Sequence, residues 1–493
     1  MISLVTLSVL ASFYHPIVSA APTASDSLPI CIVGAGPTGL TVAHELEAKK
    51  IPIFIFEKQS EVGGKCQTFY DGPNGSIAHP LGAILIVNSS YTSTFPIVKS
   101  SGIRFQPSPG DLTGGKSFEY PPLNNSNFAG NDVKVTKTPS PTPDQISAIN
   151  AEVQKYNQYW QNTFAPKYSK LRYTGGIPKE LTVPFGQWLS DNGYQILPTV
   201  VSDGLTTFGY GDLSDTPAIY MLQYFTPDIL AYFAGSNNAN VVDFHKVMLA
   251  YARTISGKIM TGVTVSNIDR SSSHPVITYV PQAQNHASTP PQKQSCSSIV
   301  LAFPPVLSAL QPTPDASFPS LNMTLTSAEK SVFSRVSITS YYSGAISLPS
   351  IPYPYVFTQT PAESLAQPVL LFKLSSSSDV ANIYSWGNST GGNSTAIARG
   401  LMKKTLGAIN FGSATSNSSK TTKASPLTEK AVQAFQGWDY FPHFDSGDLA
   451  AGIYDQFNAL QGQHNTYWAS GLNGFETVEF AVRAGKDLVE SFF

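Results

Sequence analysis

The stretch Gly34-Ala35-Gly36-Pro37-Thr38-Gly39 decides the fold, because it is a glycine-rich turn of the form GxGxxG set between two kinds of element. The short apolar run 27–33 precedes it, and residues 40–50 follow with the apolar spacing of a helix. A second β-rich run, 51–56, ends at Glu57. Strand, turn, helix, strand and acid together predict one βαβ unit of a dinucleotide-binding fold.

Each position of this unit suits contact with a dinucleotide. Gly34 lets the turn tighten, Gly36 lets the backbone approach a pyrophosphate, and Gly39 lets the helix pack closely on the strand. The first turn of the helix offers free N–H groups to phosphate. The Glu57 carboxylate is placed to accept hydrogen bonds from ribose hydroxyls, and it would repel a 2′-phosphate. The pattern therefore disfavours NADP.

A second glycine turn, Gly63-Gly64-Lys65, follows six residues after Glu57. Taken alone, such a segment is most often an ordinary turn. Joined to the first motif, it indicates a second close approach to the diphosphate. A lone GxGxxG is weak evidence, so the agreement between the two turns matters.

The order GxGxxG, acid, then Gly-Gly-cation resembles the flavin-containing amine oxidase superfamily, which carries a Gly-Gly-Arg turn at this point. Lys65 stands where the family has arginine; it keeps the charge but loses the forked, bidentate geometry. The resemblance implies FAD as the cofactor. It also implies non-covalent binding, because no cysteine follows Cys296 to tether the flavin as in monoamine oxidases.

The resemblance returns at distant places in the chain. Residues 265–269 look like the strand whose valine backbone contacts adenine, which implies that role for Val265. Residues 467–471 and 478–485 are similar to the family's last strand and closing helix, so Gly471 and a backbone N–H near Val478 are expected at the flavin. The segment His79-Pro80-Leu81-Gly82-Ala83 sits where the family passes along the isoalloxazine.

These matches predict a fold class of α/β with α+β: a discontinuous Rossmann-type (GR2-like) FAD-binding domain and an inserted substrate domain of mixed sheet and helices. The predicted FAD-binding domain comprises 26–100, 240–305 and 430–493. The predicted substrate domain comprises 101–239 and 306–429. Between 261 and 302, alternating patterns predict three strands, two of them joined through a polar excursion at 281–297.

The segments 438–443 and 474–479 resemble a subgroup that includes polyunsaturated fatty acid isomerases and fungal beta-cyclopiazonate dehydrogenase. The resemblance implies an FAD-dependent oxidoreductase that dehydrogenates, or oxidatively ring-closes, a fungal secondary metabolite by hydride transfer to flavin N5. The alternatives are a fatty-acid double-bond isomerase, an amine oxidase and a non-catalytic flavin-binding protein. True monoamine oxidases carry a lysine in the stretch matching 336–346, and this chain has none there.

The candidate catalytic residues are Tyr220, Tyr224 and Glu476. The two tyrosines are four residues apart and would share one face of a helix, either as a flavin-facing wall or as ordinary core. Tyr224 could orient substrate or relay a proton, although a tyrosine of ordinary pKa is a poor base. Glu476 and His79 are alternative proton acceptors, although each such residue alone is more often a surface or capping group.

Composition limits the partners. The chain has 493 residues, a net charge of -2 and only 13 % charged residues, without a basic stripe that nucleic acid would require. Its eight histidines are scattered, so no metal site is predicted. We expect a small-molecule substrate, no nucleic acid and no stable membrane insertion; nothing in the sequence indicates an oligomeric state.

Residues 1–20 are typical of a signal peptide cleaved near Ala20, with small residues at 18 and 20. An uncleaved anchor or a disordered tail is the alternative. Secretion fits six Asn-X-Ser/Thr sequons, which support a glycoprotein weakly because these residue types are abundant. The chain has three cysteines, of which one pair at most can form a disulfide. The sequons begin at Asn88, Asn124, Asn322, Asn388, Asn393 and Asn417.

Overall fold

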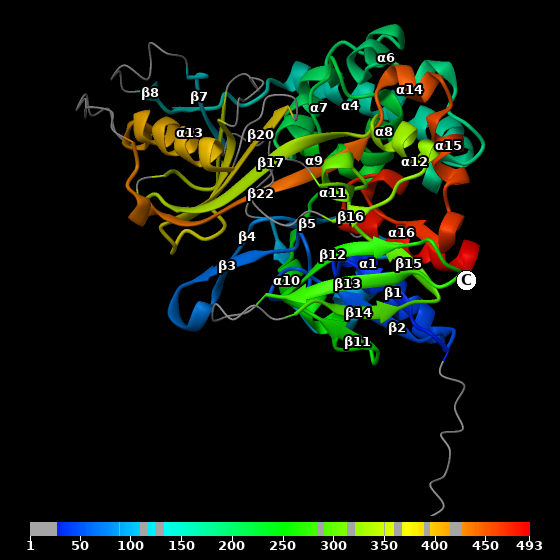
Figure 1. Ribbon diagram of the computed structural model, residues 1–493. Coiled ribbons are helices and arrows are strands. Elements are labelled where there is room, and N and C mark those ends of the chain that lie inside the picture. Colours follow the sequence, from blue (N-terminus) through cyan, green and yellow to red (C-terminus); the bar gives the residue numbers. More distant parts are fainter. Residues whose placement is uncertain are drawn as a thin grey trace, which may run out of the picture.

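The computed structural model describes residues 27–87, 89–108, 117–123, 133–282, 290–312, 321–349, 351–358, 367–388, 395–414 and 426–493. Two sheets dominate it: a smaller parallel sheet in the lower part of Figure 1 and a long, strongly twisted sheet above it. The predicted signal peptide, 1–20, and the sequons at Asn88, Asn124, Asn393 and Asn417 lie outside the described residues.

The lower sheet is the predicted dinucleotide-binding core. It has five strands in the order β11-β2-β1-β15-β23, and every neighbouring pair is parallel. The runs ICIV of β1 and IFIF of β2 are buried on both faces, as central parallel strands require. The strands are β1 Ile30–Val33, β2 Ile53–Phe56, β11 Lys258–Met260, β15 Ser298–Leu301 and β23 Thr466–Trp468.

Helices from both ends of the chain cover this sheet. Helix α1, Pro37–Ala48, packs against the closing helix α16, Val478–Phe492, and against α10, Phe244–Ala252. The backbones meet closely where Gly485 faces Thr38 and Thr41, because a Cβ at Gly485 would lie 2.9 Å from the Thr38 carbonyl oxygen. Sequence-distant segments therefore complete one domain, and the discontinuous Rossmann-type fold is confirmed.

A four-stranded sheet extends from the edge of this core in the order β14-β13-β12-β16. Strand β13 is antiparallel to both β12 and β14, so a hairpin is present. Its second strand, β14, lies inside the range 281–297 that was expected to be a polar excursion, and the strand expected at 298–302 joins the parallel sheet as β15 instead. Residues 283–289 lie outside the described part. The first residue of β12, Val263, donates its N–H to the Glu57 carbonyl at 3.0 Å. The strands are β12 Val263–Asp269, β13 Val276–Pro281, β14 Gln292–Ser295 and β16 Asn322–Met323.

The upper sheet has seven strands in the order β22-β17-β20-β19-β18-β7-β9. One face carries helix α13, Thr395–Ala408, and the other faces the first domain and the helical region (Figure 1). The strands are β7 Ser117–Tyr120, β9 Thr136–Lys137, β17 Ser337–Ser347, β18 Tyr355–Thr358, β19 Pro368–Phe372, β20 Val380–Asn388 and β22 Val432–His443.

Sheet membership moves two of the predicted domain boundaries. Strand β22 pairs along its length with β17, so 432–443 belongs to the substrate-domain sheet although we predicted it in the FAD-binding domain. Strand β16 pairs with β12 and extends the first domain into the range 306–429. From the sequence, each segment was assigned to the domain of the residues that flank it in the chain. In the structure, hydrogen bonding to strands that are distant in the chain decides its domain.

The remaining elements are helices, short strands and one further hairpin. Most of the range 143–252 is helical, and hairpin β3-β4 projects beneath the large sheet. The helices are α2 Phe95–Ser100, α4 Pro143–Tyr159, α5 Ala165–Tyr168, α6 Phe185–Asp191, α7 Leu197–Thr206, α8 Ala218–Tyr224, α9 Pro227–Phe233, α11 Leu307–Leu310, α12 Ser327–Phe333, α14 Ser446–Ala450 and α15 Ile453–Ala459. The other strands are β3 Thr68–Asp71, β4 Ile77–Pro80, β5 Leu85–Ile86, β6 Gln106–Pro107, β8 Val133–Lys134, β10 Asn240–Val241 and β21 Ile409–Asn410.

Candidate functional site

The start of α1 has the features of a phosphate-binding turn. Gly36 is the N-cap, Pro37 is the first helical residue, and no side chain caps the first-turn N–H groups. Gly34 has φ +105°, a backbone conformation that favours glycine, and a Cβ at Gly39 would overlap the Gly34 carbonyl oxygen. The turn is therefore tight, and its uncapped N–H groups are available to an anion.

The second glycine turn lies directly against the first. A Cβ at Gly64 would sit 3.0 Å from the Gly36 Cα, and Gly64 has φ +56°. Gly63 holds the two turns together, because its N–H donates to the Ala35 carbonyl at 2.9 Å. The sequence placed these turns at one diphosphate, and their juxtaposition forms a side-chain-free surface of the kind that a diphosphate needs.

Glu57 stands at the end of β2 beside this surface. Its side chain is buried, with Oε2 accepting from the Ala35 N–H at 2.7 Å and Oε1 accepting from the Gln59 N–H at 2.8 Å. Each carboxylate oxygen keeps a further lone pair for a ribose hydroxyl. Val265 lies on β12, two residues after Val263, whose N–H donates to the Glu57 carbonyl. The residue predicted to contact adenine is therefore close in the chain to the backbone beside Glu57.

Lys65, next to the second glycine turn, contacts residues that lie on the side of the substrate domain. Its Nζ pairs with Glu476 Oε1 at 2.8 Å and lies 5.2 Å from the centre of the Tyr440 ring. A Cβ at Gly82 would overlap the Lys65 carbonyl oxygen, and a Cβ at Gly471 would overlap Glu476 Oε2. The predicted residues of four separate segments thus converge. Glu476 Oε2 itself is buried without a hydrogen-bond partner, which leaves an acceptor free for a bound hydroxyl.

The two other predicted flavin contacts border the same region. Ala83 follows Gly82 directly and is half-buried. Val478 is the first residue of α16, whose N-cap Thr477 accepts from the Phe480 N–H at 3.2 Å. The N–H of Val478 is therefore among those that the helix leaves without an intrahelical partner. The residues present fit an FAD molecule on the uncapped helix, the paired glycine turns and the free carboxylate oxygen.

Tyrosines form a wall above Glu476. The Tyr210 hydroxyl donates to the Glu476 carbonyl at 3.0 Å, and the Tyr440 hydroxyl donates to Tyr210 at 3.0 Å. Tyr224 stacks on Phe475 with ring centres 5.4 Å apart. Burial raises the pKa of Tyr210, Tyr224 and Tyr440 well above the ordinary value. These phenols stay neutral at physiological pH, so Tyr224 can donate a hydrogen bond but cannot serve as the base.

Tyr220 serves a structural purpose. Its hydroxyl accepts from the Phe444 N–H at 3.0 Å and lies 3.0 Å from the Tyr454 hydroxyl. Its ring is 1 % exposed, and it lines neither the apolar cavity beside the large sheet nor the polar cavity beside α9. His79 is also fully buried, with Nε2 2.9 Å from Asp71 Oδ1. Of the predicted proton-handling residues, Glu476 and Tyr224 border the convergent site.

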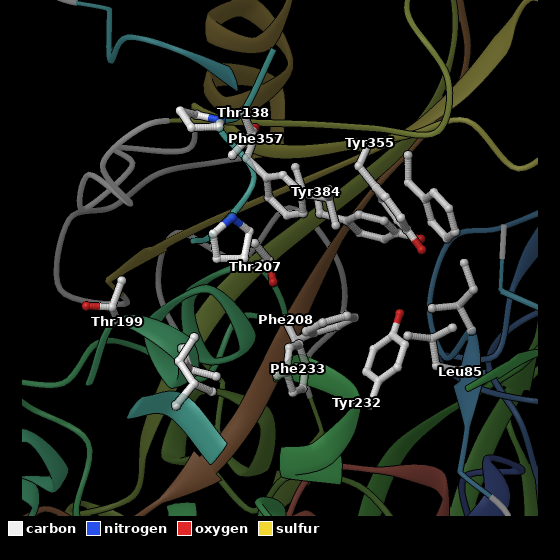
Figure 2. Close-up of a pocket in the computed structure, with 17 residues that line it drawn as sticks. Leu85, Thr138, Thr199, Thr207, Phe208, Tyr232, Phe233, Tyr355, Phe357 and Tyr384 are labelled. Atoms are coloured by element: carbon white, nitrogen blue, oxygen red, sulfur yellow. The ribbon is translucent and has the colours of Figure 1, made fainter. Parts of the chain in front are cut away.

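An apolar cavity of about 230 Å³ lies between the seven-stranded sheet and the helices (Figure 2). Ile84 and Leu85 of its wall follow Ala83 directly, and the Tyr384 hydroxyl donates to the Pro80 carbonyl at 3.1 Å. The cavity therefore borders the segment predicted to pass along the isoalloxazine. Most of its other lining is apolar and aromatic: Ile149, Val200, Phe208, Tyr232, Phe233, Tyr355, Phe357, Leu370 and Phe372.

Sequence reasoning did not find this cavity. Its walls come from α4, α7, α9 and three strands of the large sheet, and Figure 2 shows Tyr232 and Tyr355 reaching towards each other from opposite walls. Apolar residues on these elements look like core in sequence, and only their arrangement leaves a space. The one available signal in the sequence was the cluster of aromatic residues at 208–225, of which Phe208 lines the cavity.

Comparisons with known proteins agree with this geometry. A family model described as NAD(P)-binding Rossmann-like domain matches residues 32–100. The chain is 24 % identical to uncharacterized protein R656 of Acanthamoeba polyphaga mimivirus, over 90 % of this chain and 89 % of that protein. It is 22 % identical to the FAD-dependent oxidoreductase oblC of Cochliobolus heterostrophus, over 89 % of this chain and 85 % of that protein.

Two solved structures extend the likeness to the whole fold. A CLA-producing fatty acid isomerase from P. acnes superposes with a TM-score of 0.73 at 21 % identity, over 96 % of this chain and all of that chain. Wild-type putrescine oxidase bound to putrescine superposes with a TM-score of 0.59 at 14 % identity, over 94 % and 98 %. The chain therefore shares the fold of these two enzymes. Together with the Rossmann-like match and the relatives named FAD-dependent oxidoreductases, this confirms the predicted resemblance to the flavin-containing amine oxidase superfamily.

Proposed function

We propose that this protein is an FAD-dependent oxidoreductase that oxidises an apolar small molecule. The observation that carries the proposal is the convergence of the uncapped α1 start, the paired glycine turns and Glu57 beside an apolar cavity. FAD, when bound, accepts a hydride from a carbon held against its reactive ring. The full-length relatives named FAD-dependent oxidoreductases support this reading.

The residues of the chain supply binding, orientation and exclusion of water. Gly36, Gly64 and the first turn of α1 hold the diphosphate, and Glu57 holds the adenosine ribose. Lys65 and Glu476 lie between the diphosphate turn and the tyrosine wall, where a ribityl chain can hydrogen-bond to the free Glu476 oxygen. The uncapped N–H of Val478 lies at the start of α16, and this end of a helix favours negative charge on a group bound beside it.

The cavity determines the class of substrate. Its lining is dominated by aromatic and aliphatic side chains, and no charged side chain lines it among the described residues. A charged amine would lose its hydration there without a partner. Thr339 lies in the stretch where amine oxidases carry lysine, and its hydroxyl donates to the Gly209 carbonyl at 2.7 Å. Dehydrogenation or ring closure of an apolar secondary metabolite fits these walls better than amine oxidation.

Double-bond isomerisation of a fatty acid is the second candidate, favoured by the same apolar cavity. The two reactions differ in their need for an electron acceptor, because isomerisation returns the hydride to the substrate. Flavin-loaded protein should be incubated without oxygen with extracts of fungal cultures and with polyunsaturated fatty acids. Stoichiometric bleaching by an extract component supports oxidation, whereas turnover without bleaching supports isomerisation. Absence of both reactions would favour a non-catalytic flavin-binding protein.

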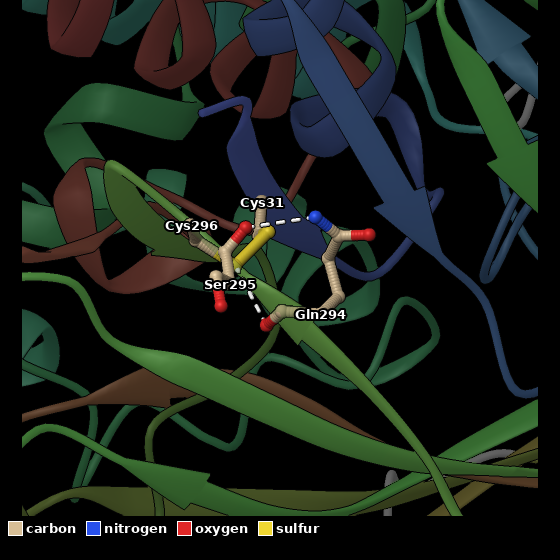
Figure 3. The surroundings of a disulfide bond; sticks show 4 residues. All are labelled: Cys31, Gln294, Ser295 and Cys296. Atoms are coloured by element: carbon tan, nitrogen blue, oxygen red, sulfur yellow. Dashed lines mark hydrogen bonds between the residues drawn. A yellow bond between two sulfur atoms is a disulfide. The ribbon is translucent and has the colours of Figure 1, made fainter. Parts of the chain in front are cut away.

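We further propose that the chain enters the secretory pathway. Cys31 of β1 and Cys296, which lies two residues before β15, form a disulfide (Figure 3), and such bonds persist mainly in oxidising compartments. The third cysteine, Cys66, is free, and burial raises the pKa of its thiol to about 12. Asn322 is exposed, as a glycosylated sequon must be. N-terminal sequencing of protein from culture medium should begin near Ala21; protein found only in the cytosol would contradict export.

The described part of the chain contains no helix long and apolar enough to cross a membrane.

A further inference from the structure

A second cavity of about 340 Å³ lies on the other side of the tyrosine wall, and most of the residues that line it carry polar groups; we call it the polar cavity. Tyr224 forms part of its lining, while the Tyr224 ring stacks on Phe475 of the convergent site. Helix α9 separates it from the apolar cavity: Thr226 to Ile229 line the polar one, and Tyr232 and Phe233 line the apolar one. The two cavities are therefore distinct.

Arg483 is the cation of this polar cavity. It projects from the second turn of α16, with its guanidinium carbon 4.6 Å from the centre of the Phe480 ring. It makes no hydrogen bond or ion pair with any described residue. Burial lowers its pKa from the ordinary value, against the opposing effects of Glu479 and Asp487. A half-buried guanidinium with unused donors is costly unless a partner satisfies it.

The neighbouring acids are already engaged. Glu479 Oε1 accepts from the Ser93 N–H at 3.0 Å, and Glu479 Oε2 accepts from the Thr94 N–H at 2.8 Å. Asp487 forms a forked pair with Arg172, with Nε to Oδ2 at 2.7 Å and Nη2 to Oδ1 at 3.3 Å.

Two further groups complete the charge and hydrogen-bonding pattern of the cavity. Asp228 lines it but lies in the first turn of α9, where the helix start stabilises its charge. Ser90 and Thr226 place hydroxyls 2.6 Å from each other at the wall. Glu479 also lines the cavity, so its single cation stands among neutral hydroxyls and two carboxylates, one held by backbone N–H groups and the other by a helix start. Arg483 is the group that still has unused donors.

We propose that this polar cavity binds a carboxylate-bearing small molecule, with Arg483 holding the carboxylate through its forked N–H groups. Planar, bidentate recognition of a carboxylate is the geometry for which a guanidinium is suited. The Phe480 ring beneath the guanidinium fixes its plane. The site takes a ligand in addition to the substrate of the apolar cavity, and it does not depend on the chemistry performed there.

Benzoate is a suitable probe because benzamide is its uncharged isostere. Flavin-loaded wild-type protein is titrated with both by calorimetry, together with Arg483→Gln and the matched control Arg253→Gln, an exposed arginine that ends α10. We expect benzoate to bind more tightly than benzamide. Arg483→Gln should weaken benzoate binding about 10- to 100-fold, the range for hydrogen bonds to charged groups, while the benzamide affinity and flavin content stay unchanged.

Two further experiments cover the case in which Arg483→Gln folds poorly. Arg483→Lys keeps the charge and should retain part of the benzoate affinity. In crystals of the wild-type protein soaked with 4-bromobenzoate, the anomalous bromine peak should lie in the polar cavity beside Arg483. Equal binding of benzoate and benzamide, unchanged benzoate affinity in folded Arg483→Gln, or a bromine peak only in the apolar cavity would overturn the proposal. None of these results would affect the flavin content on which the proposed oxidoreductase function rests.

Discussion

Replacing Glu57 with alanine should weaken FAD binding without abolishing the fold. The wild-type carboxylate is buried and offers one remaining lone pair on each oxygen to the ribose hydroxyls. Losing these charge-assisted hydrogen bonds should cost about 1–3 kcal/mol of binding free energy, which corresponds to roughly a 5- to 150-fold rise in Kd. The measurement is a titration of flavin-stripped protein with FAD, followed by quenching of flavin fluorescence.

The same variant carries a cost in stability that must be separated from binding. Glu57 also accepts from the Ala35 N–H at 2.7 Å, and removing it leaves that buried donor unpaired, which costs about 1–3 kcal/mol. FMN separates the two effects, because it has no adenosine ribose. We expect Glu57→Ala to weaken binding of FAD but not of FMN. Glu61→Ala, which removes an exposed acid nearby, should change neither affinity.

An unchanged FAD affinity in folded Glu57→Ala would refute the ribose assignment. Equal losses for FAD and FMN would show that the variant acts by distorting the glycine turn. A loss confined to FAD is the pattern that the structure predicts.

Three other perturbations test the framework around the site. Gly209→Ala places a Cβ into the ring of a buried tyrosine at a residue with φ +76°, and should cost about 1–3 kcal/mol in thermal unfolding. Arg270→Leu removes a buried forked partner of Glu329 and should cost about 3–5 kcal/mol. Although burial opposes it, the bond from Arg270 lowers the Glu329 pKa below the ordinary 4.5, so this stability is present above pH 4.5 and is lost as pH falls through the lowered value. Denaturant unfolding of Arg270→Leu and wild type should therefore converge in acid; a constant difference would contradict the pairing. Cys31→Ser with Cys296→Ser should lower stability by about 2–5 kcal/mol, and an unchanged melting temperature would contradict a formed disulfide.

The sequence predicted the backbone geometry of the two glycine turns because that geometry is local. The turn at 34–39 needs glycine at fixed spacings, and the acid at the end of the second strand is fixed by the same unit. The Gly64 turn contacts Gly36 as expected. These features are visible in sequence because glycine and strand periodicity leave local signals.

The substrate half could not be predicted because it depends on pairings between distant strands. Strand β22 joins the large sheet through β17, which the chain order does not reveal. Tyr220 and Tyr224 do lie on one short helix, yet Tyr220 is held by Tyr454 and Phe444 in the core. Lys65 and Glu476, predicted for separate purposes, form one ion pair. Helical spacing identifies a shared face but not what covers it.

The most direct test of the account is the identity of the nucleotide carried by the purified protein. The visible absorption spectrum should be that of a flavin, and heat denaturation should release free FAD at one molecule per chain. Chromatography of the released nucleotide distinguishes FAD from FMN and from nicotinamide dinucleotides. Recovery of FAD in that ratio is the result that the paired glycine turns and Glu57 predict. A colourless protein that takes up no FAD on reconstitution, or one that releases NAD instead, would contradict it.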